Sequence, residues 1–277
     1  MHALRERPES PSPVERIQEL VTNFKLPSVA REICGRLVDA GQADALETVL
    51  EVFEVEAQDR KERRVDRLRR ASNLPPAKTF DTLDLKRLPR KLAHTLRELA
   101  RGDFADRAEN VLAFGLPGVG KTHAACAVGH ALIDSGRSVL YLPTFQLVQN
   151  LLVAKRDLQL PRALRKLDLF DVILLDDIGY VQQSPEEVEV LFTLMAERYE
   201  RRSMIITSNL VFSQWDQIFK NPMTTAAAID RVVHHAIILE FNVSSYRTEQ
   251  AQGRNQVPAA ETQEVPQDPP KEDLGIN

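Results

Sequence analysis

The sequence predicts an α/β fold in which five parallel strands lie between helices, preceded by a small all-α N-terminal domain. Short apolar runs at residues 111–114, 138–142, 171–176, 203–207 and 236–241 alternate with segments of helical periodicity. Apolar strands that alternate with helices are typical of a parallel sheet covered on both faces. Before residue 75, by contrast, the chain shows only helical spacing.

Residues 12–74 are predicted to form the helical domain. Ser12, Pro13 and Glu15 make a capping box with proline at the first helical position. Pro27-Ser28 ends this helix and can cap a second one through about residue 39, and a third helix runs from about residue 44 to 71. Pro75-Pro76 stops the third helix, so we place a domain boundary there and assign residues 75–250 to the α/β domain.

The two ends of the chain are expected to be disordered. Residues 1–11 are charged and proline-rich, without the apolar core of a secretory signal. Residues 251–277 hold four prolines and five acids against two basic residues. With two cysteines and no apolar run of membrane-spanning length, we expect a cytoplasmic protein without a membrane partner.

A glycine-rich segment follows the first predicted strand. Residues 115–122 read Gly-Leu-Pro-Gly-Val-Gly-Lys-Thr and fit the phosphate-binding pattern G-x-x-x-x-G-K-[ST] between a strand and a helix. Glycines let successive N–H groups point at phosphate oxygens, and the helix that follows presents its positive dipole end. The alternative is a glycine turn with an incidental lysine. The predicted nucleotide contacts are Gly115, Pro117, Gly118, Val119, Gly120, Lys121 and Thr122.

Catalytic chemistry needs more than this loop. Lys121 is expected to reach the β- and γ-phosphates, and the Thr122 hydroxyl to ligate Mg²⁺. Asp176 ends a buried strand, where it can hold Mg²⁺, and Asp177 can orient or deprotonate the attacking water. The alternative for the two acids is a solvated strand end.

Two further polar positions are candidates for catalysis. Asn209 follows the fourth predicted strand and can hold the attacking water, although Thr207 or Ser208 could take its place and a simple polar turn is the alternative. Arg231 can neutralise charge on the γ-phosphoryl group of a neighbouring subunit. Arg231 could equally pair with Asp230 or Glu240.

In this order the motifs resemble the AAA+ ATPases, and more closely the IstB-like transposition helper ATPases, with the DnaC-type helicase loaders as near relatives. The likeness runs from about residue 14 to residue 247. It is carried by residues 109–112, 120–123, 176–180, 197–200, 206–209, 230–235 and 245–247. The sequence thus resembles an AAA+ P-loop NTPase core with an added N-terminal domain.

The resemblance implies an ATPase that uses ATP and Mg²⁺, forms ATP-dependent homo-oligomers on double-stranded DNA, and recruits and stimulates the transposase of the same element. It adds His123 to the nucleotide contacts, makes Arg231 act in trans, and matches Arg247 to a basic residue that senses nucleotide. Asp177 stands where many relatives have glutamate. Because the aspartate side chain is shorter by one methylene, we expect hydrolysis to be slow. Val243 stands where relatives usually have glycine.

Basic clusters indicate where DNA would bind. Residues 56–107 hold 15 Lys/Arg against 9 Asp/Glu, a net charge of +6 in a chain of net charge −4. Few aromatic residues are interleaved, which favours contact with the duplex backbone. The alternative is a solvated helix with intrahelical ion pairs. The candidate contacts are Arg60, Arg63, Arg64 and Arg67, and a second cluster of Lys155 and Arg156 with Arg162, Arg165 and Lys166.

Other functions remain open at this point. A DnaC-type replicative helicase loader, an ATP-switched adaptor, would share every motif described. A small-molecule kinase would share the phosphate-binding loop, but Asp177 and Asn209 are better explained by activation of water.

The adjacent histidines His234 and His235 are expected to point in different directions on a strand. We find no cysteine or acid in the sequence pattern that completes a metal-ligand set with them, so packing roles are expected.

Overall fold

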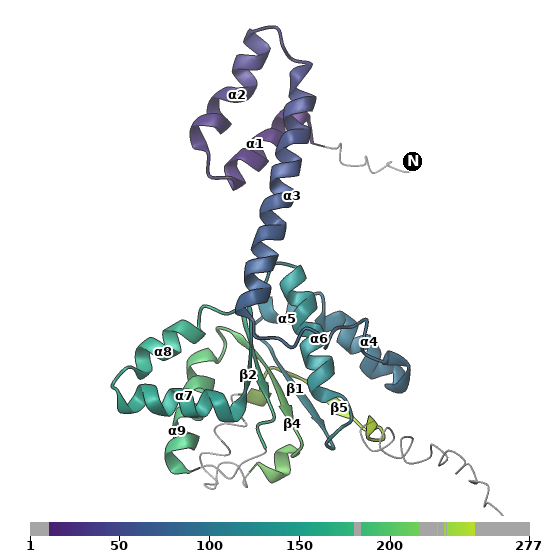
Figure 1. The fold of residues 1–277 in the computed structure, drawn as a ribbon, viewed down its shortest axis with the longest axis vertical. Helices are drawn as coiled ribbons and strands as arrows, with labels where there is room; N and C mark the ends of the chain where they lie inside the picture. The colour runs from purple at the N-terminus through teal and green to yellow at the C-terminus, as the bar shows by residue number, and fades with distance from the viewer. Residues whose placement is uncertain (1–10, 180–183, 216–225, 227–229, 231, 247–277) are drawn as a thin grey trace, which may run out of the picture.

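The computed structural model describes residues 11–179, 184–215, 226, 230 and 232–246, with Phe212 described by its main chain alone. Three N-terminal helices, α1 (Pro13–Asn23), α2 (Pro27–Asp39) and α3 (Ala45–Ala71), rise above the α/β core in Figure 1. They enclose an apolar cluster of their own, whose buried members are Ile17, Val21, Cys34 and Leu46.

The start of α1 confirms the predicted capping box. The backbone N–H of Glu15 donates to Ser12 Oγ, and the Glu15 carboxylate accepts from the backbone N–H of Ser12. The start of α2 differs from the expectation. Pro27 is the first helical residue and Leu26 the cap, without a side-chain hydrogen bond, so Ser28 lies inside the helix and does not cap it.

Five strands form one sheet in which every neighbouring pair is parallel, as predicted. They are β1 (Asn110–Gly115), β2 (Val139–Pro143), β3 (Val172–Asp176), β4 (Ser203–Ser208) and β5 (Ala236–Phe241), in the order β2-β3-β4-β1-β5. Because the strands are parallel, their carboxyl ends meet at one edge of the sheet. The residues that follow β1, β3 and β4 are therefore neighbours in space.

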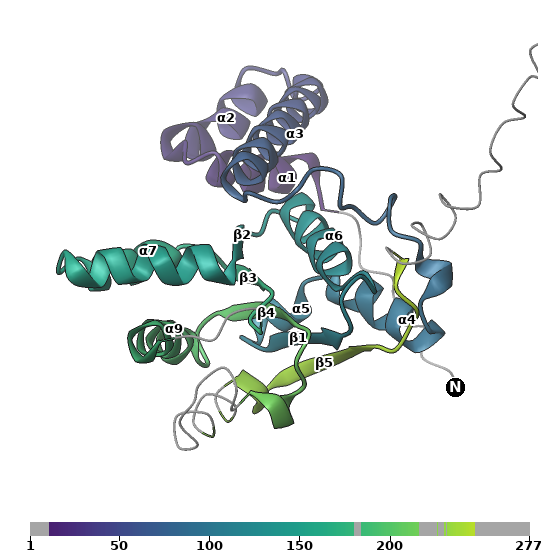
Figure 2. The same ribbon diagram turned by 60° about the horizontal axis from the view of Figure 1, so that its bottom comes forward.

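Helices cover both faces of the sheet (Figure 2). One face packs against α4 (Arg90–Leu99) and α6 (Lys121–Asp134), and the other against α7 (Thr144–Arg156) and α9 (Pro185–Arg198). β3 shows why its run is continuously apolar: Val172 and Leu174 point into the first layer, and Ile173 and Leu175 into the second. The short α5 (Asp103–Asp106) adds Phe104 to the first layer.

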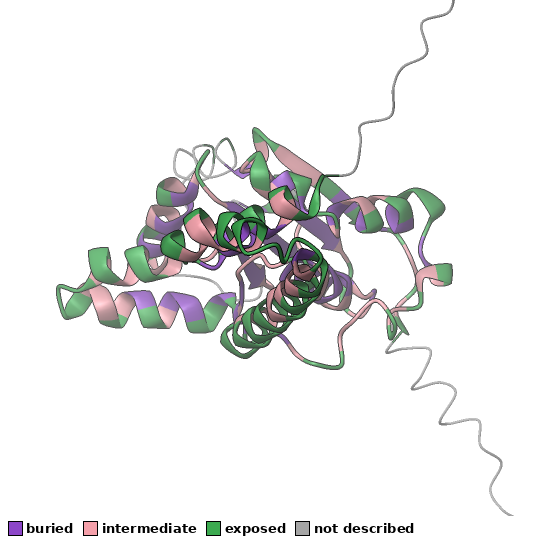
Figure 3. Ribbon diagram, turned by 90° about the horizontal axis from the view of Figure 1, so that it is seen from above, coloured by how far each residue is buried: buried purple, intermediate pink, exposed green. Residues whose placement is uncertain are grey.

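The helix α8 (Leu160–Leu167) follows α7 and contains no buried residue. Figure 3 shows buried positions concentrated in the middle of the α/β core. By contrast, Leu46 is the buried residue of α3, and α8 has none. Neither α4 nor α8 was among the helices that the sequence pattern predicted. The core is thus a five-stranded parallel sheet between two layers of helices, with extra helices around it.

The C-terminal half of α3 joins the helical domain to the core. Arg64 Nη2 donates to the carbonyl of Gly136 at 3.1 Å, and Arg69 Nη2 lies 2.6 Å from Asp134 Oδ1. After the helix, the carbonyl of Ser72 accepts from the backbone N–H of Tyr141 on β2 at 2.7 Å. The segment after α3 therefore adds a main-chain contact to the edge strand of the sheet.

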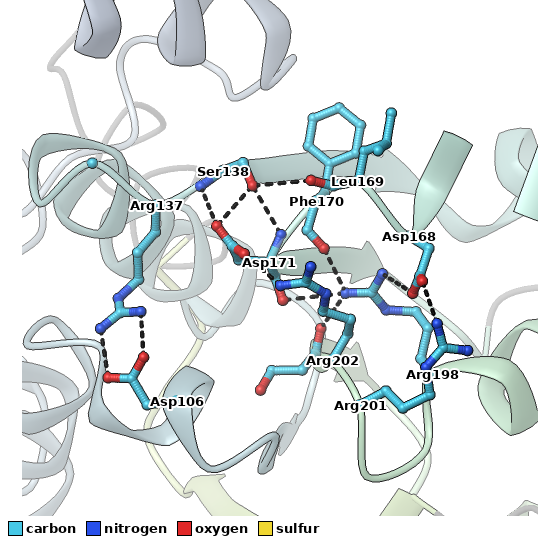
Figure 4. A network of polar contacts seen from close by, with 12 residues as sticks. Asp106, Arg137, Ser138, Asp168, Leu169, Phe170, Asp171, Arg198, Arg201 and Arg202 are labelled. Atoms are coloured by element: carbon cyan, nitrogen blue, oxygen red, sulfur yellow. Dashed lines mark hydrogen bonds and ion pairs between the residues drawn. The ribbon is translucent and has the colours of Figure 1, made fainter. Parts of the chain in front are cut away.

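A buried arginine ties together the edge of the sheet at which β3 and β4 begin (Figure 4). Arg198, at the end of α9, is 1% exposed and donates to the carbonyls of Leu167, Phe170, Asp171 and Ser203 at 3.0–3.2 Å. Burial lowers the pKa of Arg198 to about 10, so the side chain stays charged at neutral pH. α9 ends at this arginine.

Arg198→Met is expected to lower the free energy of unfolding by about 3–5 kcal/mol, because it leaves buried carbonyls without donors. The matched control is Arg201→Met, which removes a 57%-exposed side chain paired with Asp168 and should cost less than about 1 kcal/mol. Urea unfolding with unchanged m-values measures both. Equal losses in the two variants would refute the special role of Arg198.

Candidate active site

The phosphate-binding loop, residues 115–120, joins β1 to α6 at the carboxyl edge of the sheet. Gly118 (φ 83°) and Gly120 (φ 98°) occupy the left-handed region, which lets the loop curl ahead of the first turn of α6. Lys121 is buried, and its Nζ donates to the carbonyls of Gly115 and Leu116 at 2.7 and 2.9 Å. The ammonium group thus lies inside the curve of the loop.

Three hydroxyl groups converge on Asp176, the last residue of β3. Thr122 Oγ1 and Thr207 Oγ1 each donate to Asp176 Oδ1 at 2.7 Å, and Tyr141 OH donates to Oδ2 at 2.9 Å. Four elements, α6, β4, β2 and β3, therefore meet at this carboxylate. The sequence predicted that Thr122 and Asp176 serve one magnesium site. The structure places the two side chains in contact, and their role stays a prediction.

Tyr141 is a site residue that sequence reasoning missed. Burial, together with the charge and hydrogen bond of Asp176, raises the pKa of Tyr141, so the phenol remains a donor. In the sequence, Tyr141 stands out only as a hydroxyl group within an apolar strand. The sequence pattern does not predict which residue accepts its hydrogen bond.

Asp177 follows Asp176 in the left-handed region, with φ 61°. Its backbone N–H donates to Thr207 Oγ1 at 2.9 Å, which turns the chain away from the strand. Burial raises the pKa of Asp177, the charge of Asp176 raises it further, and the charge of Lys121 lowers it. A carboxyl group with a raised pKa is better suited to accept a proton than an ordinary surface aspartate.

Asn209 lies beside this turn. Its Oδ1 is buried and has no hydrogen-bond partner among the described residues. A Cβ on Gly179 would lie 2.5 Å from that oxygen, so the absence of a side chain at Gly179 makes room for Asn209. A buried acceptor left unpaired calls for a donor such as water or ligand.

A cavity of about 420 Å³ adjoins the loop. Its walls come from Gly118 to His123 and from residues in and around η1 (Leu85–Arg87). After β5, Val243, Ser244 and Tyr246 complete the lining. Tyr246 donates its backbone N–H to the carbonyl of Gly118 at 3.1 Å, and Arg87 lies over its ring at 5.0 Å. The size is ordinary for a small-molecule site. The sequence pattern predicted neither Arg87 nor Tyr246 here.

The predicted nucleotide contact His123 lines this cavity, and its ring contacts the segment before η1. His123 Nε2 lies 3.0 Å from Thr82 Oγ1 and 3.2 Å from the carbonyl of Thr79. The ring therefore fixes the segment that forms one wall of the cavity. Arg231 and Arg247 lie outside the described residues.

The predicted DNA contacts on α3 are largely engaged with the protein. Arg60 pairs with Glu56 and lies 4.3 Å from the centre of the Phe24 ring, Arg63 also pairs with Glu56, and Arg64 reaches the core as described above. Among the described residues, Arg67 has no polar partner. The i,i+4 pair of Glu56 and Arg60 is the intrahelical contact that the alternative interpretation expected.

The second basic cluster differs between its two halves. On α7, Lys155 lies 2.6 Å from Glu189 and Arg156 lies 3.2 Å from Asp157. On α8, Arg162, Arg165 and Lys166 share one exposed face and, within the part of the chain that the structure describes, have no acidic partner.

Comparison with known proteins places this site in a family. A family model described as the IstB-like ATP binding protein matches residues 21–253. The chain belongs to this family. It is 45% identical over 201 residues to an insertion sequence ATP-binding protein of Sinorhizobium fredii. The aligned region covers 72% of this chain and 67% of that protein. It is 33% identical over 236 residues to the ATP-binding protein of insertion sequence IS21 from Pseudomonas aeruginosa, covering 84% and 89% of the two chains.

Solved structures show the same fold at lower identity. AMPPCP-bound DnaA from Aquifex aeolicus matches with a TM-score of 0.53 and 17% identity, over 66% of this chain and 56% of that chain. DnaI matches with a TM-score of 0.51 and 19% identity, over 61% of this chain and 95% of that chain. Within the described ranges, no helix has the length and apolarity to traverse a bilayer.

Asp177→Asn is expected to raise the melting temperature of the nucleotide-free protein at pH 7.5, and this gain should shrink as the pH falls toward 4. The folded-state pKa of Asp177 lies above its ordinary 3.8, so the unfolded chain releases this proton first and ionisation destabilises the folded state as pH rises. Asparagine tolerates the left-handed backbone. Asp81→Asn, at an exposed position, is the control. A gain that does not change with pH would count against ionisation as its cause.

Proposed function

We propose that this protein is a Mg²⁺-dependent ATPase that assembles on double-stranded DNA and recruits the transposase of the same element. The observation that carries the proposal is the contact between Thr122 and Asp176 beside the loop that encloses Lys121. Membership of the IstB-like ATP binding protein family makes ATP the nucleotide of choice.

The residues of the site fit a magnesium ion. Mg²⁺ prefers oxygen ligands and is commonly held by one or two carboxylates or hydroxyls together with phosphates and water. Thr122 Oγ1 and Asp176 Oδ1, 2.7 Å apart, are such oxygens at the mouth of the loop. Thr207 donates to the same Oδ1 and Tyr141 donates to Oδ2, so these two bonds keep the Asp176 carboxylate oriented. The bound ion would neutralise charge on the phosphates.

Side chains and backbone of the protein bind the phosphates, accept the proton and position the water. Lys121 turns from the loop carbonyls to the β- and γ-phosphates, and the N–H groups of the loop bind the other phosphate oxygens. Asp177 takes the proton of the attacking water. Asn209, whose Oδ1 is unpaired and buried, holds that water in place.

The proposal gives Arg231 and Arg247 roles that follow from the family resemblance. Arg231 would complete the site of a neighbouring subunit, and Arg247 would sense the nucleotide after the Tyr246 contact with the loop. Hydrolysis would then depend on assembly, because no single chain supplies every charged group.

The DNA-binding surface is proposed to be the exposed face of α8, with Arg162, Arg165 and Lys166. These side chains have no acidic partner among the described residues, whereas Arg60, Arg63 and Arg64 on α3 are engaged. Unpaired cations can exchange counterions for DNA phosphates without breaking protein contacts. Arg67, Lys155 and Arg156 remain secondary candidates. The insertion-sequence context of the relatives supports a transposase as the protein partner.

The test of catalysis is ATP turnover. Wild-type protein is expected to hydrolyse ATP in the presence of Mg²⁺ and to do so faster when duplex DNA is added.

Three variants test the assigned roles in the same assay. Lys121→Ala should abolish turnover, whereas Asp177→Asn should still bind ATP without hydrolysing it. A mixture of Asp177→Asn and Arg231→Ala should recover activity if the subunits share their sites. A rate of ATP hydrolysis that does not change when DNA is added would contradict the proposal.

The test of the DNA surface is the salt dependence of duplex binding. Replacing Arg162, Arg165 and Lys166 by glutamine should weaken binding uniformly across sequences and reduce the salt slope by about 0.9 for each phosphate that the protein no longer neutralises. Arg31→Gln with Arg36→Gln, two exposed positions beside Glu32, is the control. An unchanged slope would exclude the α8 face. A preference for single strands would instead favour the helicase-loader alternative.

A further inference from the structure

Two adjacent histidines and a glutamate come together at the edge of the sheet opposite the phosphate-binding loop. Glu200 lies just after α9, and His234 and His235 lie in the turn before β5. One ligand-capable atom from each residue lies within 4.8 Å of the others. His235 Nε2 is 3.8 Å from Glu200 Oε1, and the two imidazole rings are 4.2 Å apart between centroids.

This arrangement overturns the expectation for the two histidines. They do not alternate along a strand, because β5 begins only at Ala236 and the turn before it brings both rings to one side. The acid that the sequence pattern lacked is Glu200, 34 residues before His234. Only the folded chain brings it near.

Main-chain contacts hold both segments in place. The backbone N–H of Asn110 donates to the carbonyl of His235 at 3.0 Å, and that of His234 donates to the carbonyl of Asp230 at 3.0 Å. Glu200 is held in the left-handed region, with φ 56°. On either side of Glu200, Tyr199 and Arg201 donate their backbone N–H groups to carbonyls of α9. The three side chains thus extend from hydrogen-bonded backbone, with one ligand atom from each within 4.8 Å of the others.

A second contact supports a ligand role for His234. Its Nδ1 lies 3.2 Å from Tyr199 OH. Metal-bound histidines usually use their other ring nitrogen for a hydrogen bond that fixes the ring, and a phenol oxygen can accept from an imidazole N–H. With Nδ1 engaged in this way, Nε2 is the nitrogen left for a metal.

We propose that Glu200, His234 and His235 form a binding site for a divalent transition metal of the Zn²⁺ class. Two imidazole nitrogens and one carboxylate oxygen are ligands that Zn²⁺ takes readily, whereas Mg²⁺ and Ca²⁺ prefer oxygen alone. All three residues are exposed, so water completes the coordination. The bound ion would cross-link the turn after α9 to the turn before β5.

The site is separate from the nucleotide site. β1 begins at Asn110, next to His235, and ends at Gly115, so the two sites are about 20 Å apart, the length of the six-residue strand. Metal binding is therefore testable without nucleotide, and its outcome does not depend on the proposed ATPase function.

The experiment is calorimetric titration of the untagged, chelator-treated full chain with ZnCl₂ at pH 7.5, with Mg²⁺ in the buffer to occupy oxygen-only sites. One equivalent of Zn²⁺ is expected to bind. His235→Ala and Glu200→Gln should each weaken binding by about tenfold or more, and Tyr199→Phe by a smaller factor. Because a metal competes with protons for its ligands, affinity should fall as the pH is lowered.

The matched control is His94→Ala, which removes another exposed histidine, 3.9 Å from Glu98, and should leave binding unchanged. Both Cys34 and Cys126 are buried, so thiols are not competing ligands. Cobalt absorption spectra of Glu200→Gln, an exposed conservative change, report on the ligand set independently of stability. No saturable Zn²⁺ binding, or equal affinity in wild type and a Glu200→Gln/His235→Ala double variant, would overturn the proposal.

Discussion

The site is organised by the hydrogen bonds that converge on the carboxylate of Asp176. Thr122 brings the first turn of α6, Thr207 brings the end of β4, and Tyr141 brings the middle of β2 to the last residue of β3. Such convergence requires parallel strands, since only then do the ends of β1, β3 and β4 share an edge. The phosphate-binding loop and the acids are adjacent because of this topology.

The two edges of the sheet differ in character. At the amino edge, Arg198 and its carbonyl acceptors bind the starts of β3 and β4 to the end of α9 with buried contacts. At the carboxyl edge, strained or unpaired groups collect, including Asp177 in the left-handed region and the buried Oδ1 of Asn209. Buried hydrogen bonds are thus concentrated at the amino edge. Groups in strained backbone or without a hydrogen-bond partner lie beside the candidate site at the carboxyl edge.

Local patterns predicted much of this structure. The capping box at Ser12 predicted the start of α1, and the apolar runs predicted five parallel strands. The glycine-rich loop was predicted because residues 115–122 fit a known phosphate-binding pattern. Asp176 was predicted because an acid ends a buried apolar strand. Each of these features depends on residues close together in the sequence or on one regular period.

What sequence reasoning missed depends on contacts between distant segments. Tyr141 meets Asp176 across 35 residues, and Glu200 meets His234 across 34. α8 was missed because a short, strongly charged helix resembles a solvated loop in the sequence. The arginines of α3 suggested a DNA surface, yet Arg60 and Arg64 contact Phe24 and Gly136. Charge counts do not show which cations already have partners.

Thr122 and Asp176 are proposed to form a magnesium site ready to receive ATP, and every catalytic role above depends on it. Calorimetry of ATP binding, with Mg²⁺ and with EDTA, tests this directly in wild type and Asp176→Asn. Magnesium is expected to tighten ATP binding to the wild type, and Asp176→Asn should lose most of that gain while binding metal-free ATP nearly as before. An equal magnesium effect in both proteins, or no binding heat in the wild type, would contradict the proposed site.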